Sequence, residues 1–177
     1  YLPGAVDWPI AWAGNLFSTG REQASFRVRF CREFYGLPAG DARAAAGALA
    51  ILYEMAPDGP TIDAVMEGGP RLTPEIRERC RGLFPRVSLC IERLEAVAGK
   101  ARRHAERLVD VTLSARILQR WAARGAGIEM RPDPSLLAEC RRRWKEERPY
   151  PTPVFPDAGR WQHVLLLARA LCTERRG

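Results

Sequence analysis

Two histidines and five cysteines are the residues of this chain best suited to acid–base, nucleophilic or metal chemistry. A histidine acts as a general base only where a second group positions it, and no sequence element near His104 or His163 supplies one. The spacing of the cysteines and histidines matches no short-loop zinc pattern. The glycine turns at 68–69 and 125–127 lack the lysine and hydroxyl residues of a phosphate loop. We therefore predict no catalytic residue, no metal site and no cofactor, and we interpret His104 as a histidine at the edge of a packing stripe.

The five cysteines also indicate a redox state. Their number is odd and they lie far apart, whereas a disulfide framework is normally even and dense; they are Cys31, Cys80, Cys90, Cys140 and Cys172. We predict buried, reduced thiols and an intracellular location, in the cytoplasm or the nucleus. The longest apolar runs, at 44–53 and 164–168, are too short to cross a bilayer, so no membrane partner is expected.

Arginine supplies nearly all the positive charge of the chain. The net charge is +7, and Lys100 and Lys145 are the only lysines among 28 basic residues. Some arginines repeat every four residues on one expected helix face, and a denser cluster surrounds a tryptophan; the candidate contacts for an acidic partner or a nucleic acid are Arg116, Arg120, Arg124, Arg141, Arg142, Arg143, Trp144, Lys145 and Arg148. Arg103 and Arg107 show the same four-residue spacing. Glutamates on the same helices favour a second interpretation, a solvated surface of ion pairs, and a GC-rich genome would give the same arginine excess.

A stripe of small and apolar residues runs through the middle of the chain at spacings of three and four. Its members are Phe84, Val87, Ile91, Leu94, Ala98, Ala101, Ala105, Leu108, Thr112 and Ala115. This spacing predicts one long central helix, about 86–124, that buries one face. Ala98, Ala101 and Ala105 would allow a second helix to approach closely. We favour a helix of the same bundle as that neighbour, and contact with a partner helix is the alternative.

The length of this predicted helix raises a conflict. At about 1.5 Å per residue it would span ~60 Å, whereas a compact domain of this size has a radius of gyration of about 16 Å. Either the helix breaks, near Gly99, or the molecule is elongated and exposes a helix end for assembly.

Capping residues and turn signals place the remaining elements. We predict about seven helices in a single domain, 1–177, with an N-terminal arm at 1–18 and a proline-rich strap at 149–156. The helices begin at caps such as Thr19, Asp41, Thr73, Asp133 and Asp157; their expected ranges are about 20–35, 41–56, 61–67, 73–84, 86–124, 133–147 and 157–175. Residues 26–30 also alternate as a strand would, but their helical surroundings favour a helix. The fold class is therefore all-α.

These observations favour a function without catalysis. We predict an intracellular adaptor, a helical interaction module that binds a protein partner, or another copy of itself, through a groove or a helix end. One alternative is a basic helical subunit that binds nucleic acid within a larger complex. The other is an enzyme whose carboxylates are brought together only by folding. The sequence does not name the partner.

Overall fold

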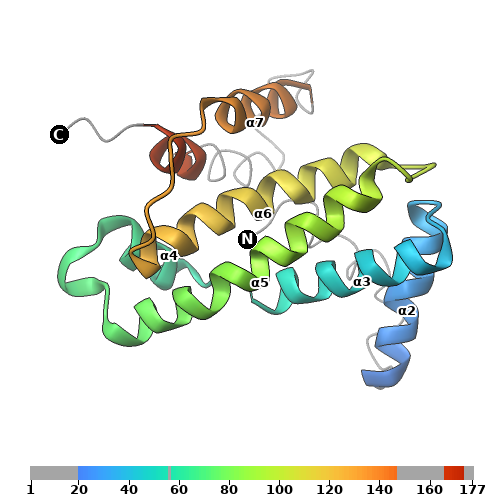
Figure 1. Ribbon diagram of the computed structural model, residues 1–177, viewed down its shortest axis with the longest axis horizontal. Helices are drawn as coiled ribbons and strands as arrows, with labels where there is room; N and C mark the ends of the chain where they lie inside the picture. The colour runs from blue at the N-terminus through green and yellow to red at the C-terminus, as the bar shows by residue number, and fades with distance from the viewer. Residues whose placement is uncertain (1–19, 56, 147–165, 174–177) are drawn as a thin grey trace, which may run out of the picture. The chain divides into compact units, whose positions relative to one another are not determined.

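The computed structural model describes residues 20–55, 57–146 and 166–173, and all regular structure in them is helical, as predicted (Figure 1). No strand occurs in these residues, so 26–30 is helix. The elements are α2 (Gly20–Phe34), α3 (Ala39–Glu54), α4 (Gly59–Glu67), the 3₁₀ turn η2 (Gly69–Arg71), α5 (Pro74–Ala98), α6 (Ala105–Ala126) and α7 (Pro134–Glu146). Residues 166–172 form a further helical segment. No helix of the described part is long and apolar enough to cross a membrane.

The chain divides into two compact units. Unit 1 contains the described residues of Pro57–Pro85 and Arg116–Gly177, and unit 2 those of Leu2–Ala56 and Arg86–Ala115. The predicted single domain, 1–177, stays a prediction. The predicted arm at 1–18 and strap at 149–156 lie outside the described residues, as do Thr19 and Asp157.

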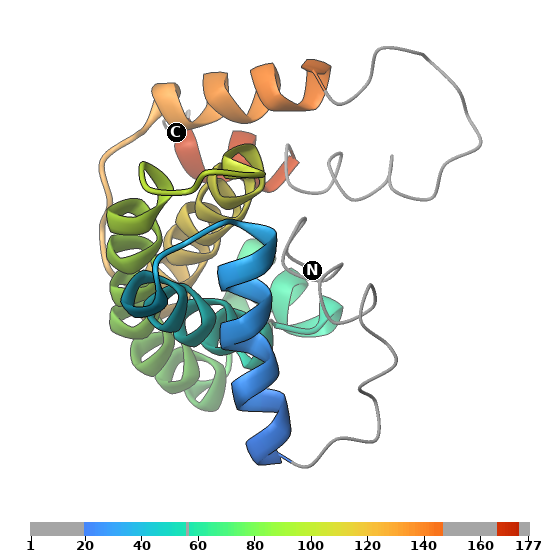
Figure 2. The ribbon, with the colours of Figure 1, turned by 90° about the vertical axis from the view of Figure 1, so that its right-hand side faces the viewer.

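The predicted helix 86–124 is wrong in its bounds, because α5 ends at Ala98 and α6 begins at Ala105. The chain turns immediately after Gly99. Of the two alternatives considered from the sequence, a helix broken near Gly99 is therefore the correct one. In unit 2, residues 86–98 and 105–115 run side by side in opposite directions (Figures 1 and 2).

In its first half, α5 continues through Pro85, where a new helix was expected. Proline leaves the carbonyl four residues earlier, that of Arg81, without its helical donor, and both residues are exposed here.

Of the caps predicted on described residues, Thr73 and Asp133 are present and Asp41 is not, and Asp58 is a cap that the sequence did not predict. Thr73 Oγ1 accepts the Ile76 N–H at 3.4 Å, and Asp58 Oδ1 accepts the Thr61 N–H at 2.7 Å, which starts α4 at Gly59. Asp133 caps α7, as described below. Asp41 does not cap α3, because that helix already begins at Ala39 and the Asp41 carboxylate instead accepts a bond from Lys100 Nζ at 2.7 Å.

Small and aromatic side chains pack where α2 meets α3 in unit 2. The alanines of α3 are largely buried, as expected for a helix apolar nearly all round, and α2 packs against that helix. The rings of Phe30 and Phe34 stack at 4.9 Å between centroids, and Tyr35 meets both edge-on.

Unit 1 contains a close helix approach at Gly125. A Cβ built there would lie 2.4 Å from Cys80 Sγ and 3.1 Å from Val65 Cγ2, so only glycine fits at this position of α6. The close approach brings the last turns of α6 next to α4, which matters for the arginine described below.

Candidate functional site

Unit 1 carries a half-open groove at the carboxyl end of α6, which we call the α6 groove. Its volume is about 610 Å³, within the range of ligand sites in proteins. The walls come from the last turns of α6, the connection to α7 and the C-terminal helical segment; the lining residues are Arg120, Ala123, Arg124, Gly127, Ile128, Glu129, Met130, Pro132, Ala170, Leu171 and Thr173. The lining combines apolar side chains with two arginines, a glutamate and a threonine, and more of its surface is polar than apolar.

The end of α6 shapes one wall of this groove. Gly127 lies in the left-handed region at φ +76° and donates its N–H to the Arg124 carbonyl at 3.2 Å. The Ile128 N–H donates back to the Ala123 carbonyl at 2.8 Å, so the helix ends in a Schellman motif that requires glycine. Ile128 follows directly and remains 40% exposed at the rim of the groove; it is one of five large apolar residues that are exposed in the described part of the chain, with Tyr53, Leu89, Val109 and Leu166.

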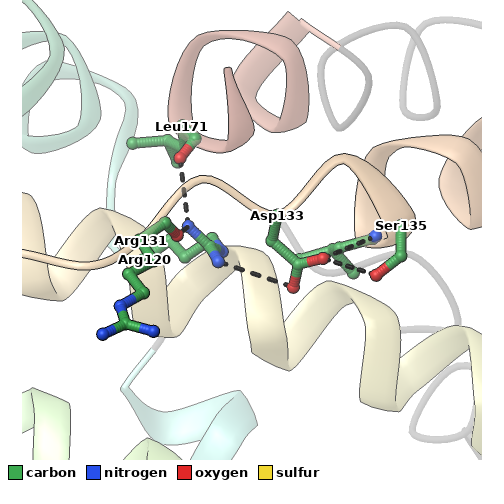
Figure 3. Close-up of polar contacts among 6 residues, drawn as sticks. Arg120, Arg131, Asp133, Ser135 and Leu171 are labelled. Atoms are coloured by element: carbon green, nitrogen blue, oxygen red, sulfur yellow. Dashed lines mark hydrogen bonds and ion pairs between the residues drawn. The ribbon is translucent and has the colours of Figure 1, made fainter. Parts of the chain in front are cut away.

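Arg120 is used inside unit 1 and not on its surface. The residue is 8% exposed. Its Nη1 donates to the Arg131 carbonyl at 2.9 Å and to the Leu171 carbonyl at 3.3 Å (Figure 3). Its Nη2 lies 3.4 Å from Asp133 Oδ2. Arg120 therefore joins the connection before α7 to the end of the C-terminal helical segment.

Asp133 completes this arrangement, as Figure 3 shows. Its Oδ1 accepts the Leu136 N–H at 3.0 Å, which caps α7 as predicted, and also accepts the Ser135 hydroxyl at 2.6 Å. Its own N–H donates to the Cys172 carbonyl at 3.0 Å. The Ser135 hydrogen bond, followed by the Leu136 N–H and the Arg120 guanidinium, holds the pKa of Asp133 below its usual value.

Arg124 also points into the protein. Its Nε donates to the Val65 carbonyl at 3.2 Å and its Nη2 to the Met66 carbonyl at 2.7 Å. These carbonyls belong to the last turn of α4, where no helical N–H follows, and a cation is favourable at that end of the helix dipole. The expected stripe of Arg116, Arg120 and Arg124 is thus not one exposed surface, because of the three only Arg116 is exposed.

The second predicted cluster lies on and after α7. Arg141 and Arg142 are exposed, and Arg143 is half-buried. Arg142 pairs with Glu139, with its Nε 2.8 Å from Oε2. This contact agrees with the ion-pair interpretation of that residue. Trp144 and Lys145 belong to α7, but their side chains, like Arg148 as a whole, lie outside what the structure describes.

The three alanines proposed as a partner-helix contact do not share a helix face. Ala98 ends α5, Ala101 lies in the connection, and Ala105 begins α6. All three are half-buried. The prediction of one continuous helix face through them was wrong, although stripe members on either side, such as Leu94 and Leu108, are buried as predicted.

The connection between α5 and α6 is well tied to unit 2. The N–H groups of Arg102 and Arg103 both donate to the Tyr35 carbonyl, at 3.0 and 3.2 Å. His104 precedes α6 at φ +49°, and its imidazole stacks on Phe34 at 4.2 Å between centroids with 14° between the planes. His104 is exposed, which differs from the partly buried position expected. His163 lies outside the described residues.

The cysteines are all free and buried, as predicted. Burial raises the pKa of the Cys31 thiol to about 12, and it also raises those of Cys80, Cys90 and Cys172. These thiols stay protonated at neutral pH, so they are poor nucleophiles and poor metal ligands. Within the described residues, no group of three or more His, Cys, Asp or Glu side chains could hold a metal ion.

Sequence reasoning missed the residues that shape the α6 groove. It identified the helix stop at 125–127, but not that Ile128 would stay exposed beyond it. The only available signal was the glycine at the end of a helix, which fixes the direction of the next residue. Comparison of the chain with protein-family models, with curated proteins and with solved structures gives no match.

Proposed function

We propose that this chain is a non-enzymatic helical adaptor that binds a protein partner through the α6 groove. The observation that carries the proposal is the exposed Ile128, which an ordered turn holds at the rim of a groove of about 610 Å³. Apolar side chains fixed at the edge of a hollow are typical of sites that receive an anchoring side chain from another protein. Met130, also in the lining, adds a side chain that adapts easily to different partners.

The chemistry of the lining supports binding rather than catalysis. Both arginines in the groove donate to backbone carbonyls, so they already serve the fold. The groove-lining residues include neither a histidine nor a cysteine. Five buried thiols suit a reducing compartment, which supports the proposal that the adaptor works inside a cell, in the cytoplasm or the nucleus.

Site-specific photo-cross-linking tests this proposal. A photoreactive phenylalanine analogue would replace Ile128, and in a control it would replace Tyr53, which is 45% exposed but lies on α3. We expect Ile128 to yield a discrete cross-linked protein in a lysate of the source organism, and Tyr53 to yield none of that species.

Binding of the partner identified in this way would then be measured with one variant that fills the groove and one control variant that does not. Ala170→Trp places a large ring on an exposed lining position, and Ala138→Trp adds the same ring to the exposed side of α7, outside the groove. Calorimetry should show binding lost in Ala170→Trp and kept in Ala138→Trp. Equal binding by the two variants would refute the groove as the site. Sedimentation of the wild type would show whether the partner is a second copy of the chain.

A further inference from the structure

The connection between α5 and α6 places exposed cations beside an exposed stacked ring. We propose that this surface of unit 2, formed by Arg102, Arg103, His104 and Phe34, binds single-stranded nucleic acid. The two guanidinium groups would contact phosphates, and the imidazole of His104 would stack on a base. This surface shares no residue with the basic clusters predicted on α6 and α7 or with the α6 groove.

The charge of this segment favours an anionic partner. Arg102 and Arg103 are exposed, and no acidic side chain in the described part of the chain forms an ion pair with either. Acids near this segment have other partners, and Glu33, next to Phe34, lies 4.0 Å from Arg29. Asp41 is paired with Lys100, and Glu106 Oε1 lies 3.6 Å from Nδ1 of His104. The two arginines therefore keep their charge available, in contrast to Lys100, and arginine suits phosphate geometry well.

Hydrogen bonds and a close approach fix the backbone of Arg102 and Arg103 before any ligand arrives. The Tyr35 carbonyl accepts both arginine N–H groups, and a Cβ built on Gly36 would lie 3.0 Å from Cβ of Arg102. Gly36 itself has φ +65°, so the close approach depends on glycine. Figure 2 shows the α2–α3 and α5–α6 connections next to each other. A surface that is already ordered loses less entropy on binding.

The ring stack identifies the class of anion. Phe34 covers one face of the His104 imidazole in a nearly parallel stack, and the His104 side chain remains 50% exposed. A base could extend this stack, and aromatic platforms flanked by cations are the usual means of binding single strands without sequence preference. A duplex keeps its base faces covered, and an acidic peptide has no base to stack. The geometry therefore favours a single strand over both.

Fluorescence polarisation with labelled oligonucleotides of about a dozen nucleotides tests the proposal. The probes are oligothymidylate and oligouridylate, titrated with wild type, Arg102→Gln/Arg103→Gln and His104→Asn. Asparagine tolerates a positive φ, so the last variant removes the stack without adding backbone strain. The matched control is Arg79→Gln/Arg86→Gln, which removes the same charge from exposed positions of α5.

We expect the wild type to bind at least one of the two probes, and the probe it prefers indicates RNA or DNA. The Arg102→Gln/Arg103→Gln variant should bind more than tenfold more weakly, with a salt slope flatter by about 1.4, since each phosphate contact contributes about 0.7 for a single strand. His104→Asn should lose about tenfold with an unchanged slope. The proposal is wrong if the wild type binds neither probe, or if the α5 control loses as much affinity as the arginine variant. Polyglutamate serves as an anionic competitor without bases. The proposal is also wrong if polyglutamate binds as tightly as the oligonucleotides while His104→Asn has no effect on binding. None of these results bears on the α6 groove.

Discussion

Arg120 in unit 1 and Arg103 in unit 2 carry the same side chain in opposite surroundings. Arg120 is 8% exposed and donates to two carbonyls while facing a carboxylate. Arg103 is exposed, and its backbone N–H donates a hydrogen bond to the Tyr35 carbonyl. The difference follows from the carbonyls nearby. Arg120 reaches the Leu171 carbonyl, at a helix end that leaves carbonyls without donors, and the Arg131 carbonyl in the connection before α7. Near Arg103 the Tyr35 carbonyl already accepts two backbone N–H groups. An arginine next to unpaired carbonyls stabilises the fold, and one without them stays available for a ligand.

The largest expected difference between these two arginines is in the free energy of unfolding lost when each is replaced. Arg120→Met would leave Asp133 without its cation and two carbonyls without a donor, so we expect a loss of about 2–4 kcal/mol in the free energy of unfolding. Arg103→Met should change it by less than about 0.5 kcal/mol, since the side chain is exposed. Urea denaturation followed by circular dichroism measures both. Equal losses would show that burial does not separate the two arginines.

The hydrogen-bond partners of the Arg120 side chain could not have been predicted from local sequence. Its acceptor on Leu171 lies 51 residues further along the chain, and nothing in the four-residue spacing of α6 indicates that this carbonyl comes near. Asp41 shows the same limit, because its partner Lys100 is 59 residues away. The caps at Thr73 and Asp133 were predictable, since their acceptors and donors are three residues apart. Contacts within one helical turn are thus visible in the sequence, and contacts between helices are not.

Gly99 illustrates an intermediate case. The stripe from Phe84 to Ala115 has the period of one helix, and the residues around the break are good helix formers, so periodicity alone favours continuity. The chain turns because Tyr35 and Gly36, far away in sequence, hold the connection through backbone bonds and a close approach. Gly99 makes a break in the helix less costly, and the contacts with Tyr35 and Gly36 determine that the break forms.

Asp133 allows the Arg120 arrangement to be weakened by acid. Its pKa lies below the usual value in the folded protein, so folding is stabilised above the unfolded pKa, about 4, and this stabilisation is lost as the pH falls through the lower, folded value. Asp133→Asn keeps a capping side chain but removes the charge, and should cost about 1 kcal/mol at neutral pH. The gap in unfolding free energy between wild type and variant should narrow as the pH falls from about 5 to about 2. A gap that stays constant across this range would mean that the charge of Asp133 contributes nothing.

The smallest expected effect is that of Arg142, the arginine of α7 whose visible partner is a neighbour on its own helix. The Glu139–Arg142 pair joins side chains 33% and 53% exposed, three residues apart. Such pairs contribute about 0.2–0.5 kcal/mol and are screened by salt. Arg142→Gln should therefore lower the free energy of unfolding by no more than about 0.5 kcal/mol at low ionic strength, and by less at about 1 M salt. Glu139→Gln is the matched control, and because the two substitutions break the same pair, the double variant should lose little more than either alone. A loss above about 1 kcal/mol, unchanged by salt, would contradict this expectation, since only a buried contact of the kind made by Arg120 resists screening so well.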